Sequence, residues 1–170
     1  MRRLTRRGRR AKTRDMEQES HDEGASRRQR TLPEEERRLL AQKELAASQQ
    51  AWDAAEVLVA QRLYRDALSR AYFGLFHAVR ALLMREGYDA RGPRLVLEVL
   101  SLRFADVGEL PAEAPAVLAR AQRYRELCDF GVGWVVTPER VLAELEVYEE
   151  HRSGLLSMLA ARGVTLPDAP

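Results

Sequence analysis

Residues 63–83 read LYRDALSRAYFGLFHAVRALL, and this stretch predicts the centre of the fold. Small residues recur in it at steps of three or four positions: Ala67, Ala71, Gly74, Ala78 and Ala81. Bulky apolar residues follow each of them one position later: Leu68, Tyr72, Leu75, Val79 and Leu82. Because such steps return to the same side of an α-helix, the stretch predicts a helix that is apolar over most of its circumference. We expect this helix to lie in the middle of the molecule, with neighbouring helices on several sides.

A narrow polar strip interrupts this apolar surface, and it consists of Asp66, Arg70 and His77. A charged group that is buried on a central helix costs several kcal/mol unless it is paired. We therefore expect any functional site in the core to begin at these three side chains.

Capping signals divide residues 31–165 into a series of helices. The helices are predicted over residues 31–62, 63–85, 95–104, 115–130 and 138–163. Thr31 is expected to cap the first helix, Gly87 to end the second and Thr137 to cap the last. The run LVLEVL at residues 95–100 fits a strand equally well by itself, but the chain offers no partner strand. The sequence thus predicts an all-α, up-and-down bundle of four to five helices.

Residues 1–30 differ from the rest of the chain in composition. They hold 11 basic and 5 acidic residues, so their net charge is +6, whereas residues 31–170 have a net charge of −4. The only large apolar residues among the first thirty are Leu4 and Met16, too few to offset the entropy of ordering. We expect a disordered basic tail, which either holds nucleic acid or an anionic surface non-specifically or is merely solvated.

The chain lacks the patterns of membrane and secreted proteins. No apolar run approaches the roughly 20 residues that cross a bilayer, and no apolar segment follows the basic start as it does in a secretory signal. Cys128 is the only cysteine, so an internal disulfide is excluded. We expect a cytoplasmic protein that makes no membrane contact.

Few residue patterns indicate a metal site or an activated nucleophile. The three histidines lie in three separate segments: His21, His77 and His151. Gly131 and Gly133 lack the Lys-Ser/Thr pair of a phosphate-binding loop. Ser69 is two helical turns from His77, so helical spacing gives it no general base. The sequence therefore predicts neither a metal nor a cofactor.

Two polar clusters remain as candidates for function. Arg70 and His77 are seven residues apart and share one face of the central helix. Arg123, Arg125 and Asp129 lie on the helix predicted at 115–130, where the last two are neighbours on the helix surface. If the two helices pack together, Asp129 can pair with Arg70. Such a pair belongs either to a functional groove or to a buried contact that only closes the bundle, and His77 has the same two interpretations.

The stretch Ser69–Leu83, SRAYFGLFHAVRALL, resembles the SRAYYAxFHAxxALL segment of HEPN-domain proteins (higher eukaryotes and prokaryotes nucleotide-binding). It is most similar to a bacterial and archaeal branch with an Arg-x-x-x-Asp-Tyr element on the fourth helix. Arg125-Glu-Leu-Cys-Asp129-Phe130 matches that element, with Phe130 in place of tyrosine. Val-Thr-Pro-Glu139 resembles the start of the family's last helix. The resemblance covers about residues 40–160.

The resemblance implies a homodimeric helical bundle, often encoded beside a minimal nucleotidyltransferase with which it forms a toxin–antitoxin pair. Catalytic HEPN proteins are metal-independent ribonucleases that pair Arg-x(4–6)-His motifs across the dimer. No histidine follows Arg123 or Arg125 within that window, where Cys128 and Asp129 stand instead. The ribonuclease motif therefore does not transfer directly.

Three hypotheses follow. The first is a dimeric HEPN module that binds RNA, a nucleotide or a partner protein, as one half of a toxin–antitoxin pair. In it Arg70 and Arg125 contact phosphate and Asp129 orients one of them. The second is a divergent endoribonuclease in which His77 transfers protons and Arg125 clamps the phosphate. The third is a non-catalytic scaffold. The candidate catalytic residues are His77, Arg125 and Asp129, and the candidate binding residues are Ser69, Arg70, Tyr72 and Arg123.

Overall fold

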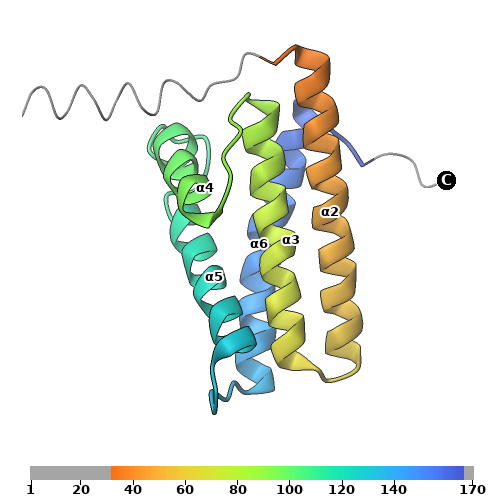
Figure 1. The fold of residues 1–170 in the computed structure, drawn as a ribbon, viewed down its shortest axis with the longest axis vertical. Helices are drawn as coiled ribbons and strands as arrows, with labels where there is room; N and C mark the ends of the chain where they lie inside the picture. The colour runs from red at the N-terminus through yellow and green to blue at the C-terminus, as the bar shows by residue number, and fades with distance from the viewer. Residues whose placement is uncertain (1–31, 167–170) are drawn as a thin grey trace, which may run out of the picture. The chain divides into compact units, whose positions relative to one another are not determined.

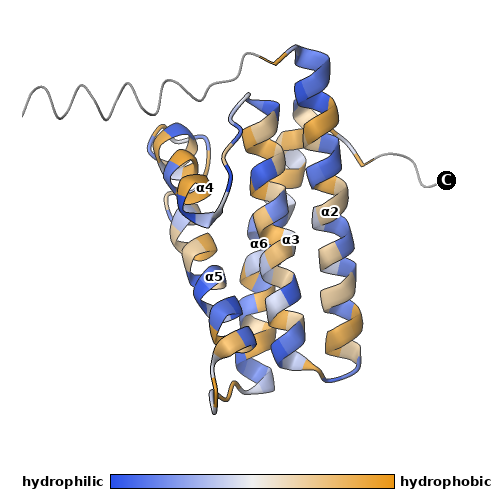
Figure 2. Ribbon diagram, viewed as in Figure 1, coloured by the Kyte–Doolittle hydropathy of each residue, from blue (hydrophilic) through white to orange (hydrophobic). Residues whose placement is uncertain are grey.

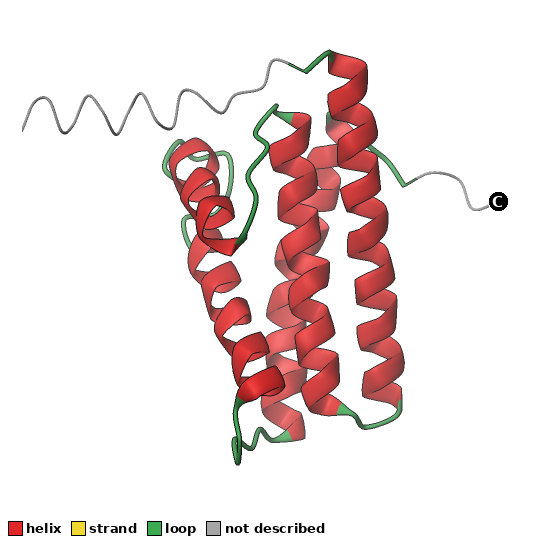
Figure 3. Cartoon of the chain, viewed as in Figure 1, coloured by secondary structure: helices red, strands yellow, loops and turns green. Residues whose placement is uncertain are grey.

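A computed structural model describes residues 32–166, and this part of the chain is a bundle of helices joined by loops (Figure 3). The helices are α2 (Glu34–Ala60), α3 (Tyr64–Arg85), α4 (Pro93–Leu100), α5 (Ala114–Phe130) and α6 (Pro138–Ala161), with a π-helical turn η1 (Ser101–Ala105) after α4. Residues 32–166 contain no strand, so the all-α prediction is confirmed. The predicted basic tail and the predicted cap at Thr31 lie outside the described residues. Within the described range, no helix has both the length and the apolarity to span a bilayer.

Helix α3 is the centre of the bundle, as its sequence predicts. It packs against α2, α4, α5 and α6, and Figure 1 shows it in front of α6 and between α5 and α2. The small residues and the bulky residues beside them are buried almost completely, from Ala67 and Leu68 at its start to Leu82 and Leu83 at its end. Hydrophilic and hydrophobic segments alternate along α2 in Figure 2, which is the pattern of a helix with one buried side.

Gly74 allows α2 and α3 to approach each other closely. A Cβ atom at this position would lie 3.0 Å from Cε3 of Trp52 and 3.5 Å from the carbonyl oxygen of Ser48. Trp52 is itself only 7% exposed, so its ring has little room to move. The stripe of small residues on α3 therefore faces α2, and Gly74 is its point of closest contact.

We expect Gly74→Val to lower the free energy of unfolding by about 2–3 kcal/mol, because two methyl groups would be forced against the Trp52 ring. Gly154→Ala is the matched control, since a Cβ there meets no heavy atom within 4 Å. That change should raise the free energy of unfolding by about 0.5–1 kcal/mol, because alanine loses less backbone entropy in a helix. Urea denaturation measures both, and a Gly74→Val variant as stable as the parent would contradict the close approach.

Two of the predicted helix ends are confirmed, at Gly87 and Thr137, and the predicted end of the first helix is wrong by two residues. Helix α2 ends at Ala60, two residues earlier than predicted, because Arg62 adopts a φ of 60° and the Leu63 amide bonds back to the Leu58 carbonyl at 2.9 Å. Gly87 ends α3 with a φ of 87°, as predicted. Thr137 caps α6, as predicted: its hydroxyl accepts a hydrogen bond from the Arg140 amide at 3.3 Å.

The helix predicted at residues 95–104 is confirmed, but its last turn is wider than an α-helical turn. In η1 the Asp106 amide bonds to the Ser101 carbonyl, five residues back, at 2.9 Å. The turn brings Phe104 against the core, where it is 2% exposed, while Leu102 remains on the surface. The periodicity of apolar residues cannot distinguish these two kinds of turn over so short a stretch.

A buried arginine, Arg152 of α6, joins three helices. Its guanidinium donates to Ser48 Oγ at 3.2 Å and to Gln49 Oε1 at 2.5 Å, and lies 5.2 Å from the ring centroid of Trp52. Ser48 in turn donates to the Gly74 carbonyl of α3 at 2.7 Å. Arg152 is 3% exposed, so these contacts are needed to satisfy its charge.

Candidate functional site

The polar strip of α3 lies between the contacts of this helix with α2 and α5: His77 contacts Glu44 of α2, and Ser69, the neighbour of Arg70, contacts Asp129 of α5. It is less buried than the sequence analysis expects, because Asp66 and Arg70 are exposed. His77 is the exception, with a side chain that is only 26% exposed. The strip is therefore a partly open surface rather than part of the core.

Asp129 at the end of α5 contacts α3 through a serine. Its Oδ1 accepts a hydrogen bond from Ser69 Oγ at 2.8 Å, and its Oδ2 lies 3.2 Å from Nη1 of Arg125. The pairing of Asp129 with Arg70 that the sequence analysis allows is wrong. Ser69 points toward α5, whereas Arg70, one residue and 100° further around the helix, is exposed and lies over the ring of Phe73.

The ring of Phe73 contacts three polar side chains on this surface. The guanidinium carbon of Arg70 lies 4.7 Å from its ring centroid, and that of Arg125 lies 5.9 Å away. The imidazole of His77 stacks on Phe73 with a centroid distance of 6.3 Å. Residues of α3 and α5 that sequence analysis treats as two clusters thus form one surface. We call it the α3 polar face, and it consists of Ser69, Arg70, Phe73, His77, Arg125 and Asp129.

His77 is held by a carboxylate that the sequence analysis missed. Its Nδ1 lies 2.7 Å from Oε2 of Glu44 on α2, and the other carboxylate oxygen lies 3.0 Å from Nη2 of Arg80. The Glu44 side chain is 17% exposed. Within residues 32–166, Nε2 of His77 has no hydrogen-bond partner, and it is not among the fully buried polar atoms. The carboxylate therefore fixes the ring and leaves Nε2 accessible for proton exchange.

The antiparallel pairing of α2 and α3 could have revealed Glu44. A tight turn at residues 61–63 joins the two helices, and residues at similar distances from this turn, within about one helical turn, face each other. Ser48 and Gly74 form one such pair, and Glu44 and His77 form another, one turn further from the link. No local pattern around Glu44 marks it.

The two remaining candidates are not part of the α3 polar face, although the Tyr72 ring lies 5.1 Å from the ring centroid of Phe73 and 5.8 Å from the guanidinium carbon of Arg125. Tyr72 is 2% exposed and stacks on Phe76 at 5.5 Å, so its ring belongs to the core. Burial raises the pKa of its hydroxyl to about 12, although the nearby Arg125 charge acts in the opposite direction. Arg123 is exposed and forms no ion pair within the described part of the chain.

Arg65 fixes the end of α5 that carries Asp129. Its Nη2 donates to the carbonyl oxygens of Cys128 at 2.7 Å and Leu127 at 3.3 Å, where a cation complements the helix dipole. Burial raises the pKa of the Cys128 thiol to about 11, with Arg65 opposing this effect. Near neutral pH the thiol thus stays protonated, and Cys128 does not supply a base at this site.

The α3 polar face offers cations, an aromatic ring and an imidazole in one place. Two guanidinium groups suit phosphate oxygens, the ring of Phe73 suits a base, and His77 suits proton transfer. No group of three or more metal-ligating side chains occurs within residues 32–166.

These features define a small all-α bundle whose central helix carries an arginine, aromatic and histidine surface. The family model described as the HEPN domain matches residues 41–152. This chain belongs to the HEPN domain family, and the resemblance drawn from Ser69–Leu83 is thereby confirmed.

Curated proteins similar to this chain come from archaea and a cyanobacterium. The chain is 28% identical over 96 residues to "Putative toxin MJ0605" of Methanocaldococcus jannaschii, which covers 56% of this chain and 69% of the relative. It is 32% identical over 77 residues to "UPF0332 protein PH1297" of Pyrococcus horikoshii, 45% of this chain and 51% of the relative. It is 29% identical over 84 residues to "UPF0332 protein glr0978" of Gloeobacter violaceus, 49% of this chain and 67% of the relative. The match thus spans from about one half to about seven tenths of the length of these relatives.

Proposed function

We propose that this HEPN protein is the toxin of a toxin–antitoxin pair and that it binds single-stranded RNA on the α3 polar face. The observation that carries the proposal is the part-exposed ring of Phe73 with the guanidinium groups of Arg70 and Arg125 at 4.7 and 5.9 Å. An unpaired base stacks on an aromatic ring, and flanking arginines neutralise the adjacent phosphates. Two similar proteins carry the word toxin in their names, which supports the biological role.

A second copy of the chain is the partner that we propose for the neighbouring surface. Phe130, Val132 and Val135, at and beyond the end of α5, are 74%, 103% and 84% exposed. Apolar side chains at this level of exposure are costly to leave in water, and an isologous contact would cover them. Such a dimer would bring two α3 polar faces together. A nucleotidyltransferase-type protein is the proposed antitoxin.

RNA binding is tested most directly at Phe73. We expect Phe73→Leu to weaken the binding of a fluorescent single-stranded RNA by about 10–100-fold, because stacking contributes roughly 1–3 kcal/mol per base. Leucine keeps an apolar side chain of similar reach, so the fold should survive. Fluorescence anisotropy at fixed salt measures the affinity. Arg94→Gln, which removes an exposed charge on α4, is the control and should change the affinity little.

Growth measurements test the toxin role. Expression of the chain should arrest bacterial growth, and co-expression of a nucleotidyltransferase-type protein encoded beside it should restore growth. Phe73→Leu should abolish the arrest if RNA is the target. An unaffected arrest would contradict RNA as the target, and normal growth with the parent chain would contradict the toxin role.

The pair of His77 and Glu44 favours a second candidate function, a metal-independent endoribonuclease. In this reaction Nε2 of His77 takes the proton of a ribose 2′-hydroxyl as its oxygen attacks the adjacent phosphorus. The new O–P bond closes a 2′,3′-cyclic phosphate, the bond between phosphorus and the 5′-oxygen of the next nucleotide breaks, and that oxygen leaves as a hydroxyl after taking a proton from water. Arg125 would hold the non-bridging phosphate oxygens. The observation that supports this candidate is the 2.7 Å contact of Glu44 with Nδ1, which leaves Nε2 as the reactive nitrogen.

A further inference from the structure

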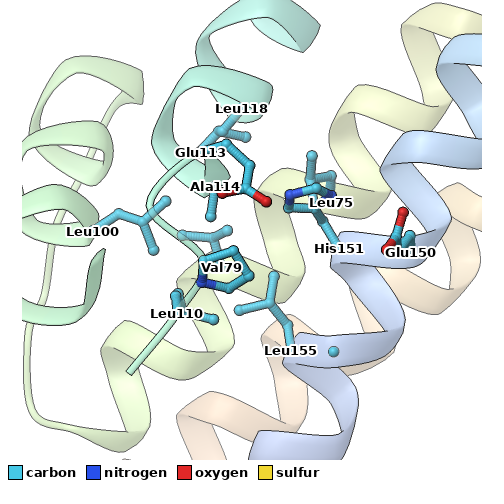
Figure 4. Close-up of a pocket in the computed structure, with 12 residues that line it drawn as sticks. Leu75, Val79, Leu100, Leu110, Glu113, Ala114, Leu118, Glu150, His151 and Leu155 are labelled. Atoms are coloured by element: carbon cyan, nitrogen blue, oxygen red, sulfur yellow. The ribbon is translucent and has the colours of Figure 1, made fainter. Parts of the chain in front are cut away.

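A pocket separate from the α3 polar face lies among α3, α5, α6 and the segment between α4 and α5. Its volume is about 170 Å³. Its walls are mainly apolar, and they include Leu75, Val79, Leu100, Leu118 and Leu155, which Figure 4 shows around a common space. This volume is close to the about 150 Å³ of a protein cavity that holds benzene. The pocket is therefore large enough for a single aromatic ring.

His151 of α6 supplies one buried polar atom to this pocket. Its Nδ1 lies 2.9 Å from the Val147 carbonyl oxygen, and since a carbonyl only accepts, Nδ1 carries a proton. In the neutral ring Nε2 then has a free lone pair. Nε2 is buried, and no group within residues 32–166 donates to it. A buried acceptor without a donor costs free energy, which a ligand with an N–H or O–H group would recover.

The charged groups around the pocket determine whether it favours a cationic or an anionic ligand. Glu113 and Glu150 line the pocket, and the lining includes no lysine or arginine. Figure 4 shows the carboxylate of Glu113 directed toward the ring of His151. Each polar side chain at the pocket therefore accepts hydrogen bonds, and the two carboxylates attract a cation and repel an anion. A phosphate-bearing nucleotide does not fit this environment.

Gly154 leaves the wall of the pocket open on the α6 side. It lies inside a 24-residue helix, where glycine destabilises the folded state, and a Cβ there would meet no heavy atom within 4 Å. The packing of the helices thus does not require glycine at this position. A larger side chain at position 154 would enter the pocket from its solvent side. It would fill the pocket without displacing core side chains.

We propose that this pocket binds a small molecule that joins one apolar ring to a protonated amine. The ring occupies the space between Leu75, Leu118 and Leu155. The ammonium group donates to Nε2 of His151 and pairs with Glu113 or Glu150 at the edge. None of the residues of the α3 polar face lines this pocket, so the proposal is independent of RNA binding.

Three ligands of nearly equal size test the selectivity of the site. Phenethylamine, 2-phenylethanol and phenylacetate share the ring and differ in the charge of the polar end. Titration into the isotopically labelled full chain, followed by NMR of the Leu75 and Val79 methyl groups, should give saturable binding of the amine with a dissociation constant of about 1 mM or lower. The alcohol should bind more weakly, and the carboxylate at least about tenfold more weakly than the amine. Equal binding of amine and carboxylate, or no saturable shift with the amine, would overturn the proposal.

Two variants test the assigned residues. His151→Phe keeps a ring of similar size but removes the acceptor, and it should raise the dissociation constant for phenethylamine at least about tenfold. Gly154→Leu should block the pocket without unfolding the chain, so it keeps the test decisive if His151→Phe fails to fold. Phe73→Leu is the control and should leave amine binding unchanged. Amine binding that survives Gly154→Leu would place the ligand elsewhere and refute the assignment.

Discussion

Replacing His77 with alanine is expected to lower the rate of RNA cleavage by the purified protein by about 10²–10⁴-fold, the usual contribution of a general acid–base group. The reason is the single accessible nitrogen: Glu44 occupies Nδ1 at 2.7 Å, so Nε2 is the atom that would exchange a proton with the ribose hydroxyl. Cleavage of a fluorophore–quencher RNA in a buffer with a metal chelator measures the rate. Circular dichroism checks that the variant keeps its helices.

Glu44→Gln separates positioning from catalysis. The amide can still accept a hydrogen bond from Nδ1, but it no longer stabilises the imidazolium, so the cleavage rate should fall about tenfold. A scaffold role for Glu44 would instead lower stability and leave the cleavage rate of the folded protein unchanged. If the parent chain cleaves no RNA, or if His77→Ala cleaves as fast as the parent, the endoribonuclease candidate is wrong. RNA binding at Phe73 is then judged by the anisotropy measurement alone.

The largest expected loss of stability comes from Arg152→Ala, which should lower the free energy of unfolding by about 2–4 kcal/mol. Its guanidinium bonds to Ser48 and Gln49 of α2 and to Glu149 of its own helix, and its side chain is 4% exposed. The alanine variant loses these charge-assisted hydrogen bonds and leaves a space beside Trp52. Thermal unfolding should show a fall in Tm of roughly 10 °C for a domain of this size.

Two further variants identify the cause of that loss. Arg94→Ala removes an exposed arginine and should change the free energy of unfolding by less than about 0.5 kcal/mol. Arg152→Met restores most of the lost volume without the charge, so it should recover part of the stability if packing beside Trp52 matters. A Tm for Arg152→Ala equal to that of the parent would show that Ser48 and Gln49 are satisfied without the guanidinium.

The fold could be predicted from the sequence because the apolar residues of α3 cover most of its circumference, which requires neighbouring helices on several sides. A helix with small residues on one side and bulky residues beside them has to be surrounded, and Gly74 against Trp52 is the direct result. The helix ends could also be predicted where one residue decides them, as at Gly87 and Thr137. The π-turn at Ser101–Ala105 could not, because its extra residue has no side-chain signature.

The site could be predicted only in part, because helical spacing relates residues within one helix and not between helices. Asp129 and Arg125 were placed together correctly, since they are four residues apart. The partner of Asp129 on α3 depends on the rotation of that helix, and this rotation selects Ser69 and not Arg70. Predicting Glu44 as the partner of His77 would have required the register between α2 and α3. The turn at residues 61–63 sets this register, and no pattern near Glu44 indicates it.

The register of α2 against α3 also has a consequence for how the protein is made. These two helices are consecutive, their link is short, and their contacts are local in sequence, so we expect them to pair before the later helices leave the ribosome. The imidazole of His77 would then be positioned by Glu44 at a stage when Arg125 and Asp129 have not yet been synthesised. A truncated translation product that stops before α5 would carry an oriented histidine but no arginine from α5 to grip a phosphate. The α3 polar face is thus complete only after α5 has been synthesised, and under the proposed RNA-binding function an unfinished chain would hold phosphate less well.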